Sequence, residues 1–163
     1  MVDLDAAFGG QRQLELIGRI AKAAAPALVQ VGGGIRDARA AEETLEAGAG
    51  RVILISDGLS ATGMPDGKYM LGKFEVTVSG GVCRNSEGKL AGSTLTLDRA
   101  LRNVVALGIP LQDVVRMLTA NPAKLLGIEF KKGALRTGAD ADIVLLDENL
   151  QVTNVWTRGL PLN

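Results

Sequence analysis

The fold is decided by the stretch Arg51-Val52-Ile53-Leu54-Ile55, which is followed directly by Ser56-Asp57-Gly58. A strand buried on both faces of a parallel sheet has a short, continuous apolar run bounded by turn residues, and this stretch has that pattern. Similar runs lie at residues 2–5 and 27–31, and apolar residues at helical spacing separate the three runs. This alternation of strands and helices favours an α/β fold with a parallel sheet covered by helices.

The pattern changes after Asp57. Residues 63–90 alternate with period two and contain the turn signals Asp66-Gly67 and Gly80-Gly81, which predicts a β-hairpin. Asn121-Pro122 is expected to cap and begin a short helix that ends at Gly127. The other elements are expected as helices at residues 11–24, 37–48, 94–107 and 111–119, and as strands at residues 142–147 and 151–159.

The length of 163 residues is below the roughly 250 residues of a complete eight-stranded barrel. We therefore expect incomplete TIM-barrel-like parallel βα units, with a β-hairpin insertion and a small C-terminal β-appendage. An incomplete sheet has open edges, and a second copy of the chain is the expected cover, which predicts a homodimer.

Composition excludes several classes of partner. Lysines plus arginines equal aspartates plus glutamates at 18 each, so the chain has no electrostatic footprint for nucleic acid or an anionic membrane. No apolar run approaches the length of a membrane span. Cys83 is the single cysteine, which excludes an internal disulfide and predicts a cytoplasmic protein. Residues 2–5 follow Met1 without the features of a signal peptide, and this abrupt start favours a trimmed chain.

A glycine triplet forms the best-placed binding motif, within Gly32-Gly33-Gly34-Ile35-Arg36. It follows a predicted strand and precedes a predicted helix, so glycine backbone, helix N-terminus and Arg36 can together bind an anion. A phosphate or sugar phosphate is the natural ligand, with Gly33, Gly34 and Arg36 as its contacts. A plain turn from strand to helix is the alternative interpretation.

Asp57 is the candidate catalytic residue. It lies at the carboxyl end of a predicted strand, where barrels display catalytic groups, and a carboxylate there can act as a general base. The alternative is that Asp57-Gly58 is only a turn or a helix cap. The sequence contains no histidine, so we expect no metal site of the zinc or iron type and no cofactor.

Three other features are expected to have no role in a site. Glu42, Glu43 and Glu46 are interpreted as a solvated helix face. Trp156 is expected to be a packing residue, and Cys83 has no histidine to activate it.

Residues 2–54 resemble phosphoribosylformimino-aminoimidazole carboxamide ribotide isomerase of histidine biosynthesis. The resemblance rests on Val2-Asp3-Leu4-Asp5-Ala6-Ala7-Phe8, on Val29–Arg36 and on Arg51-Val52-Ile53. It implies strands two to four of that family's TIM barrel and one of its phosphate sites, at Gly33, Gly34 and Arg36. The family's acid–base aspartates lie on strands one and five, which have no counterpart here, so isomerase activity is not expected.

Residues 52–163 resemble the C-terminal part of N-acetylglucosamine-6-phosphate deacetylase, of the amidohydrolase superfamily. The resemblance rests on several spaced motifs, namely Leu54–Gly58, Met64–Gly67, Leu90–Leu95, Thr119–Ala123 and Gly138–Asp147. It implies that Asp57 matches the catalytic aspartate of barrel strand eight, which handles the proton of a metal-bound water. That family's metal ligands, a glutamate and histidines, precede strand eight and are not matched, so Asp57 is expected to be a vestigial general base.

The chain is therefore interpreted as chimera-like, with segments at 1–56, 57–130 and 131–163. We expect a recombined scaffold without native catalysis. One alternative is a binding module for phosphate or sugar phosphate at Gly32–Arg36. The other is a deacetylase-type hydrolase whose metal is held by carboxylates such as Asp57, Asp3 and Asp5.

Overall fold

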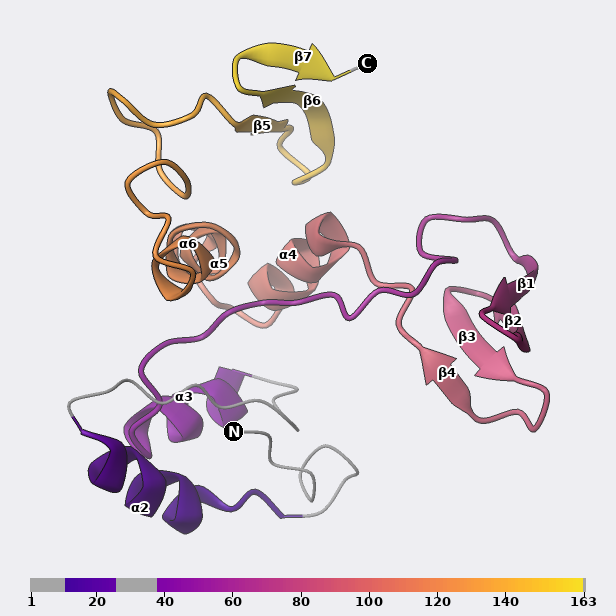
Figure 1. Ribbon diagram of the computed structural model, residues 1–163, viewed down its shortest axis with the longest axis horizontal. Coiled ribbons are helices and arrows are strands. Elements are labelled where there is room, and N and C mark those ends of the chain that lie inside the picture. The colour runs from indigo at the N-terminus through magenta and orange to yellow at the C-terminus, as the bar shows by residue number, and fades with distance from the viewer. Residues whose placement is uncertain (1–10, 26–37, 163) are drawn as a thin grey trace.

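The computed structural model describes residues 11–25 and 38–162 (Figure 1). The predicted strands at 2–5 and 27–31, and the glycine motif with Arg36, lie outside the described residues. The helices are α2 (Leu14–Ala24), α3 (Ala38–Glu46), α4 (Leu97–Ala106), α5 (Leu111–Leu118) and α6 (Ala120–Leu125). The strands are β1 (Gly67–Leu71), β2 (Phe74–Ser79), β3 (Val82–Asn85), β4 (Leu90–Gly92), β5 (Ile143–Leu146), β6 (Val152–Thr157) and β7 (Leu160–Leu162).

The stretch Arg51–Ile55 is extended but is not a strand, so that prediction is wrong. A strand is defined by ladder hydrogen bonds to a neighbour, and among the described residues no strand lies beside this stretch. The segment crosses in front of α4 on its way from α3 to β1 (Figure 1). The described residues form an α/β structure whose two sheets are both antiparallel, so the expected barrel-like parallel sheet is not confirmed.

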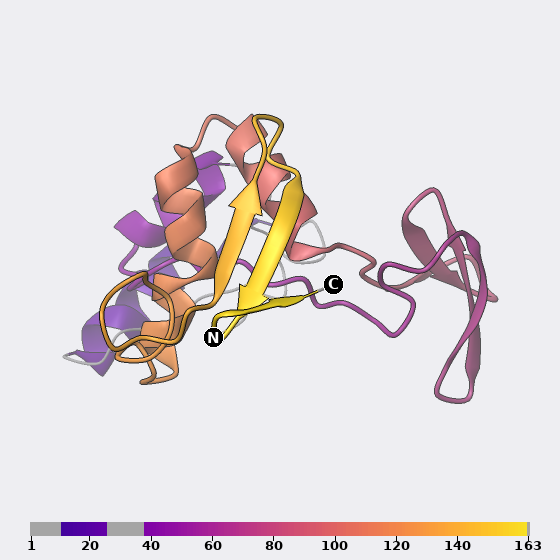
Figure 2. The ribbon, with the colours of Figure 1, turned by 90° about the horizontal axis from the view of Figure 1, so that it is seen from above.

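The predicted hairpin is a four-stranded antiparallel meander in the order β1-β2-β3-β4. Alternate residues of β2 point to one face, where Val76 and Val78 are buried with Cys83 and Ala61. The sheet therefore has its own small core, which explains why the single cysteine is buried. In both Figure 1 and Figure 2 this sheet lies to one side of the helices, at the end of two chain crossings.

The second sheet is formed by β5, β6 and β7 in that order. The strands predicted at 142–147 and 151–159 are confirmed as β5 and β6, and β7 is an additional strand that the sequence pattern did not indicate. The Arg102 guanidinium on α4 donates to the carbonyl oxygen of Leu150 at 3.1 Å, which links the β5–β6 turn to the helices.

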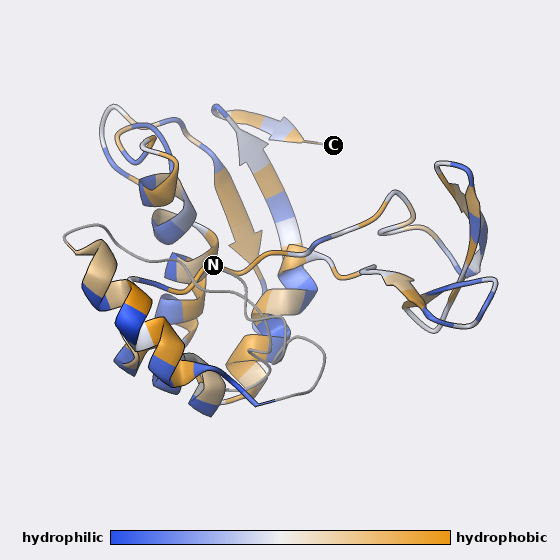
Figure 3. Ribbon diagram, turned by 60° about the horizontal axis from the view of Figure 1, so that its bottom comes forward, coloured by the Kyte–Doolittle hydropathy of each residue, from blue (hydrophilic) through white to orange (hydrophobic). Residues whose placement is uncertain are grey.

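The helices pack through apolar faces, as their periodicity predicts. Ile17 of α2 is buried, as are Ala40 and Thr44 of α3, and Ala100 and Val114 are buried on α4 and α5. Hydrophobic and hydrophilic residues are interleaved along these helices (Figure 3). Within the described residues, no helix is both long enough and apolar enough to cross a membrane.

The chain exposes far more surface than a closed domain of its mass. Its accessible surface is 11112 Å², whereas a compact monomer of this mass exposes about 7,700 Å² by the usual scaling. Large apolar side chains account for part of the difference, among them Ile55, Phe74 and Leu135, each more than 70% exposed. The fold is thus open, and the homodimer stays a prediction of what covers this surface.

Candidate functional site

Asp57 lies at the carboxyl end of the extended segment that the sequence predicted to be a strand. Its side chain is exposed. Its backbone has a φ of +46°, in the left-handed region that costs a non-glycine residue about 1 kcal/mol or more. Aspartate tolerates this region better than most residues do, and strained residues of this kind are concentrated at functional sites. The geometry therefore agrees both with a catalytic carboxylate and with the simpler turn.

The turn at Asp57 is clamped by Ser93, which lies in the loop before α4. Gly58 forms a parallel bridge with Ser93, and the Leu59 amide donates to the Ser93 carbonyl oxygen at 3.0 Å. The Thr62 hydroxyl donates to the same oxygen at 3.2 Å. The Ser93 hydroxyl in turn accepts from the Leu95 amide at 3.0 Å, which fixes the loop itself. Two motifs that are far apart in the sequence thus meet directly beside Asp57.

The other end of the segment is held by α5 and α6. The side-chain amide of Asn121 donates to the Val52 carbonyl oxygen at 2.7 Å, and the Leu54 amide donates to the Met117 carbonyl oxygen at 3.2 Å. Asn121 was expected to be a helix cap, which is wrong, because α6 begins one residue earlier, at Ala120. Its contact with Val52 spans 69 residues of sequence, and no local pattern could reveal it.

A cavity of about 450 Å³ lies at this amino end of the segment. Apolar residues such as Leu45, Val52 and Ile109 contribute most of its surface. Charged residues also line it, namely Glu42, Arg51, Asp113 and Arg116. Asp57 does not line it. The cavity and the candidate carboxylate are therefore separate features at opposite ends of one extended segment.

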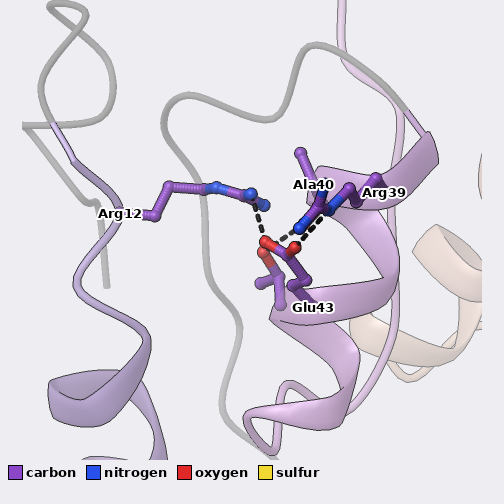
Figure 4. A network of polar contacts seen from close by, with 5 residues as sticks. Arg12, Arg39, Ala40 and Glu43 are labelled. Atoms are coloured by element: carbon purple, nitrogen blue, oxygen red, sulfur yellow. Dashed lines mark hydrogen bonds and ion pairs between the residues drawn. The ribbon is translucent and has the colours of Figure 1, made fainter.

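Glu43 is not a freely solvated residue, contrary to the expectation for that helix face. It accepts an ion pair from Arg39, one turn earlier, at 2.7 Å and a second one from Arg12, which precedes α2 (Figure 4). The Arg39 hydrogen bond is the main reason why the pKa of the Glu43 carboxyl lies below its ordinary value. This network joins α3 to the segment before α2, and we assign it a structural role.

The acidic motif Gly138–Asp147 is tied to Lys132. The Lys132 ammonium lies 2.8 Å from the Asp140 carboxylate and also pairs with Asp142. These contacts lower the pKa of both aspartates, chiefly through their hydrogen bonds with Lys132, and raise the pKa of Lys132, chiefly through Asp140. Because every carboxylate of this cluster has a cation beside it, the cluster fits a connection between α6 and β5 better than a binding site.

The described residues do not fit the metal centre that the deacetylase resemblance implies. Nowhere in residues 11–25 and 38–162 do three histidine, cysteine, aspartate or glutamate side chains come together as metal ligands. The sequence also has no histidine. Asp3 and Asp5, the other carboxylates suggested as ligands, lie outside the described residues, as do Gly33, Gly34 and Arg36. We therefore assign no metal to Asp57.

The family model and the similar proteins found by comparison agree with one another. The sequence model of the amidohydrolase family matches residues 31–161. N-acetylgalactosamine-6-phosphate deacetylase of Escherichia coli O157:H7 is 44% identical over 110 residues, which are 67% of this chain and 29% of that protein. N-acetylglucosamine-6-phosphate deacetylase of Vibrio furnissii is 40% identical over 110 residues, 67% of this chain and 28% of that protein.

The share of each relative that is matched varies widely. A relative from Escherichia coli strain K12 is also 44% identical over 110 residues, but these residues make up 66% of its length. That relative is therefore itself a short chain. The chain thus spans just under two thirds of one curated relative and less than a third of the two deacetylases described above.

Solved structures agree with the sequence relatives. N-acetyl-D-glucosamine-6-phosphate deacetylase from Mycobacterium smegmatis has a TM-score of 0.69 at 36% identity, over 83% of this chain and 38% of that chain. The Thermotoga maritima deacetylase has a TM-score of 0.61 at 35% identity, over 68% and 30% of the two chains. An aspartate-to-alanine variant of the Mycobacterium smegmatis enzyme was solved in complex with N-acetyl-D-glucosamine-6-phosphate. It matches 93% of this chain and 55% of that chain, with a TM-score of 0.61 at 26% identity.

Proposed function

This chain belongs to the amidohydrolase family, and we propose that it provides part of the active site of an N-acetylhexosamine-6-phosphate deacetylase. The observation that carries the proposal is the placement of Asp57 at the end of an extended segment that is tied at both ends. The relatives at 40% and 44% identity are deacetylases of N-acetylglucosamine 6-phosphate and N-acetylgalactosamine 6-phosphate. They favour a deacetylase over a scaffold without catalysis, which was the first interpretation of the sequence.

The proposed reaction is hydrolysis of the acetamido group. Water adds to the acetyl carbonyl carbon, the carbon–nitrogen bond breaks, and acetate and the amino sugar phosphate leave. The step needs a group that accepts a proton from the attacking water and delivers it to the departing nitrogen. We assign this role to Asp57, because its carboxyl is exposed to an incoming substrate and its backbone is held in a strained turn.

The chain supplies only part of the site. It covers less than a third of the two deacetylases described above, and its described residues form no metal centre. The proposal therefore assigns to this chain the proton-transfer carboxylate and the loop that clamps it, and derives no step through a metal. The remaining catalytic groups would come from residues beyond those described.

The class of substrate proposed for this chain is taken from its deacetylase relatives. A phosphate-bearing sugar is the proposed ligand, and Gly33, Gly34 and Arg36 are the residues proposed to contact its phosphate. The isomerase-like origin of residues 2–54 stays a prediction, as does the division into segments 1–56, 57–130 and 131–163. The family match begins at residue 31 and so overlaps the isomerase-like segment.

The test is an exchange experiment. Residues 51–162 replace the matched segment of the Escherichia coli O157:H7 deacetylase, and acetate release is measured with both N-acetylhexosamine 6-phosphates. We expect activity in the exchanged enzyme and a loss of about 10²–10⁴-fold on Asp57→Asn, the usual contribution of a positioned acid–base group. Asp113→Asn is the matched control, because Asp113 lies on α5, lines the cavity at the other end of the segment and is partly exposed. Full activity of the Asp57→Asn enzyme would remove Asp57 from the mechanism.

The isolated chain is tested in the same assay. The proposal predicts that it releases no acetate without the remaining part of a deacetylase. Turnover by the chain alone, abolished by Asp57→Asn, would show that it holds a complete site and that its undescribed residues supply the missing groups.

A further inference from the structure

Among the described residues, the extended segment before Asp57 forms its backbone hydrogen bonds along one edge. In an extended chain, successive residues direct their backbone groups to opposite edges, so Val52 and Leu54 share an edge. Both are engaged there, Val52 by Asn121 and Leu54 by Met117. Within the described residues, no hydrogen bond reaches the backbone groups of Ile53 or Ile55 on the other edge. The α5–α6 turn therefore occupies the position of a neighbouring strand.

One of the two hydrogen bonds on this edge comes from a side chain. Met117 contributes a backbone carbonyl, which any residue would supply, whereas Asn121 contributes its side-chain amide. The hydrogen bond is partly buried and, at 2.7 Å, short for an amide donor. Partial shielding from water makes such a bond stronger than an exposed one. Asparagine is a poor helix former, so helix propensity does not explain its place inside α6.

We propose that Asn121 is a positioning residue for Asp57, because it holds the segment 52–57 extended from the side where a neighbouring strand would pair with it. The segment is anchored by Asn121 and Met117 at one end and by Ser93 at the other, so its direction and length are fixed between two points. Loss of the Asn121 anchor frees the amino half of the segment and lets the Asp57 turn move. The effect of Asn121 on catalysis rests on the function proposed above. Its hydrogen bond to the segment does not depend on that function.

The test follows the segment itself by NMR and amide hydrogen exchange. Asn121→Leu removes the donor, and we expect the Leu54 amide to exchange about fivefold faster, the factor that corresponds to about 1 kcal/mol for one hydrogen bond. The Gly58 amide resonance shifts as well. Asn103→Leu is the matched control, since Asn103 is an exposed asparagine on α4. A folded Asn121→Leu chain with unchanged Leu54 exchange and an unchanged Gly58 resonance would overturn the proposal.

Asn121→Asp provides a second test, in which the hydrogen bond is switched by pH in a single variant. This test applies even if the Asn121→Leu chain does not fold. An ionised carboxylate cannot donate to the Val52 carbonyl, whereas the protonated acid can. We expect the Leu54 amide resonance to move away from the wild-type position at neutral pH and to return below about pH 4, the usual range of an aspartate. Leu54 serves as the reporter because Gly58 directly follows the Asp57 carboxyl and would respond to that group as well. Asn103→Asp shows no such return. A Leu54 resonance with the same pH dependence in both variants would overturn the proposal.

These measurements do not involve turnover, so they separate the two claims. If the segment responds as expected but Asp57→Asn keeps full activity in the exchanged enzyme, the proposed function fails and the anchor stands. If Asp57 is essential but the segment is indifferent to Asn121, the anchor fails and the function stands.

Discussion

Lys132 and Asp140 form an ion pair at 2.8 Å that joins the segment after α6 to the start of the C-terminal sheet. Asp142 extends the pair, because its carboxylate also accepts the hydroxyl of Thr157, the last residue of β6, at 3.2 Å and the amide of Arg158, the next residue, at 2.8 Å. Lys132 thus connects the turn region after α6 with the residues that lead into β5 and, through Asp142, with the end of β6. We therefore expect the stability of the C-terminal sheet to depend on pH.

The first prediction concerns that pH dependence. The pKa values of Asp140 and Asp142 are lowered in the folded chain, so their contribution is present above about pH 4, the unfolded value, and is lost as pH falls through the lowered pKa values. Lys132→Gln should lower the urea midpoint at pH 7 and have less effect at pH 2–3. Lys131→Gln, at an exposed neighbour, is the control. An equal effect of Lys132→Gln at both pH values would contradict the prediction.

The second prediction concerns the strained turn. Asp57 has a positive φ, whereas Ser56 does not, and glycine adopts positive φ without steric cost. Asp57→Gly should therefore leave the free energy of unfolding close to the wild-type value, while Ser56→Gly should lower it by roughly 0.5–1 kcal/mol. Urea unfolding of both variants measures the difference. An Asp57→Gly chain that is less stable than the Ser56→Gly chain would indicate that the Asp57 side chain makes a stabilising contact.

The third prediction concerns the clamp on Ser93. Thr62→Val keeps the shape of the side chain but removes the hydroxyl that donates to the Ser93 carbonyl. We expect a loss of about 1 kcal/mol and faster exchange of the neighbouring Leu59 amide, which shares the same acceptor. Thr77→Val on the exposed face of β2 is the matched control. Unchanged Leu59 exchange would show that the clamp does not depend on the hydroxyl.

The fourth prediction compares two isoleucines. Ile17 is 2% exposed and Ile55 is 73% exposed. Ile17→Val should cost roughly 0.5–1.5 kcal/mol, as is usual for a buried site, whereas Ile55→Val should stay within about 0.5 kcal/mol. Unfolding at several protein concentrations provides the measurement. A cost at Ile55 that grows with concentration would place Ile55 in an interface between two copies and support the predicted homodimer.

Local sequence pattern predicted the helices well. The spans 94–107 and 111–119 correspond to α4 and α5, because apolar spacing along one helix depends only on neighbouring residues. The meander was predicted as a hairpin of the right extent, and its turn signals lie where the strands reverse. Secondary structure that depends on nearby residues could therefore be predicted from the sequence.

Features that depend on contacts between distant residues could not be predicted from the sequence. Arg51–Ile55 has the apolar composition of a strand, yet a strand exists only when a partner lies beside it, and composition does not supply the partner. Asn121 followed by proline is typical of a helix start, so its contact with Val52 was missed. Asp57 could be proposed as a candidate from its motif, but the clamp by Ser93 and Thr62 became visible only in three dimensions.

The β1–β4 meander has a consequence for how this part of the family can diverge. Its buried residues, Val76, Val78, Cys83 and Ala61, pack mainly against one another and their immediate neighbours rather than against the helices. Loops or strands inserted at its distant turns, such as Gly72 or Gly88, would lengthen the sheet without displacing the Ser93 clamp. The meander is thus a place where relatives can gain or lose residues while the turn at Asp57 keeps its geometry.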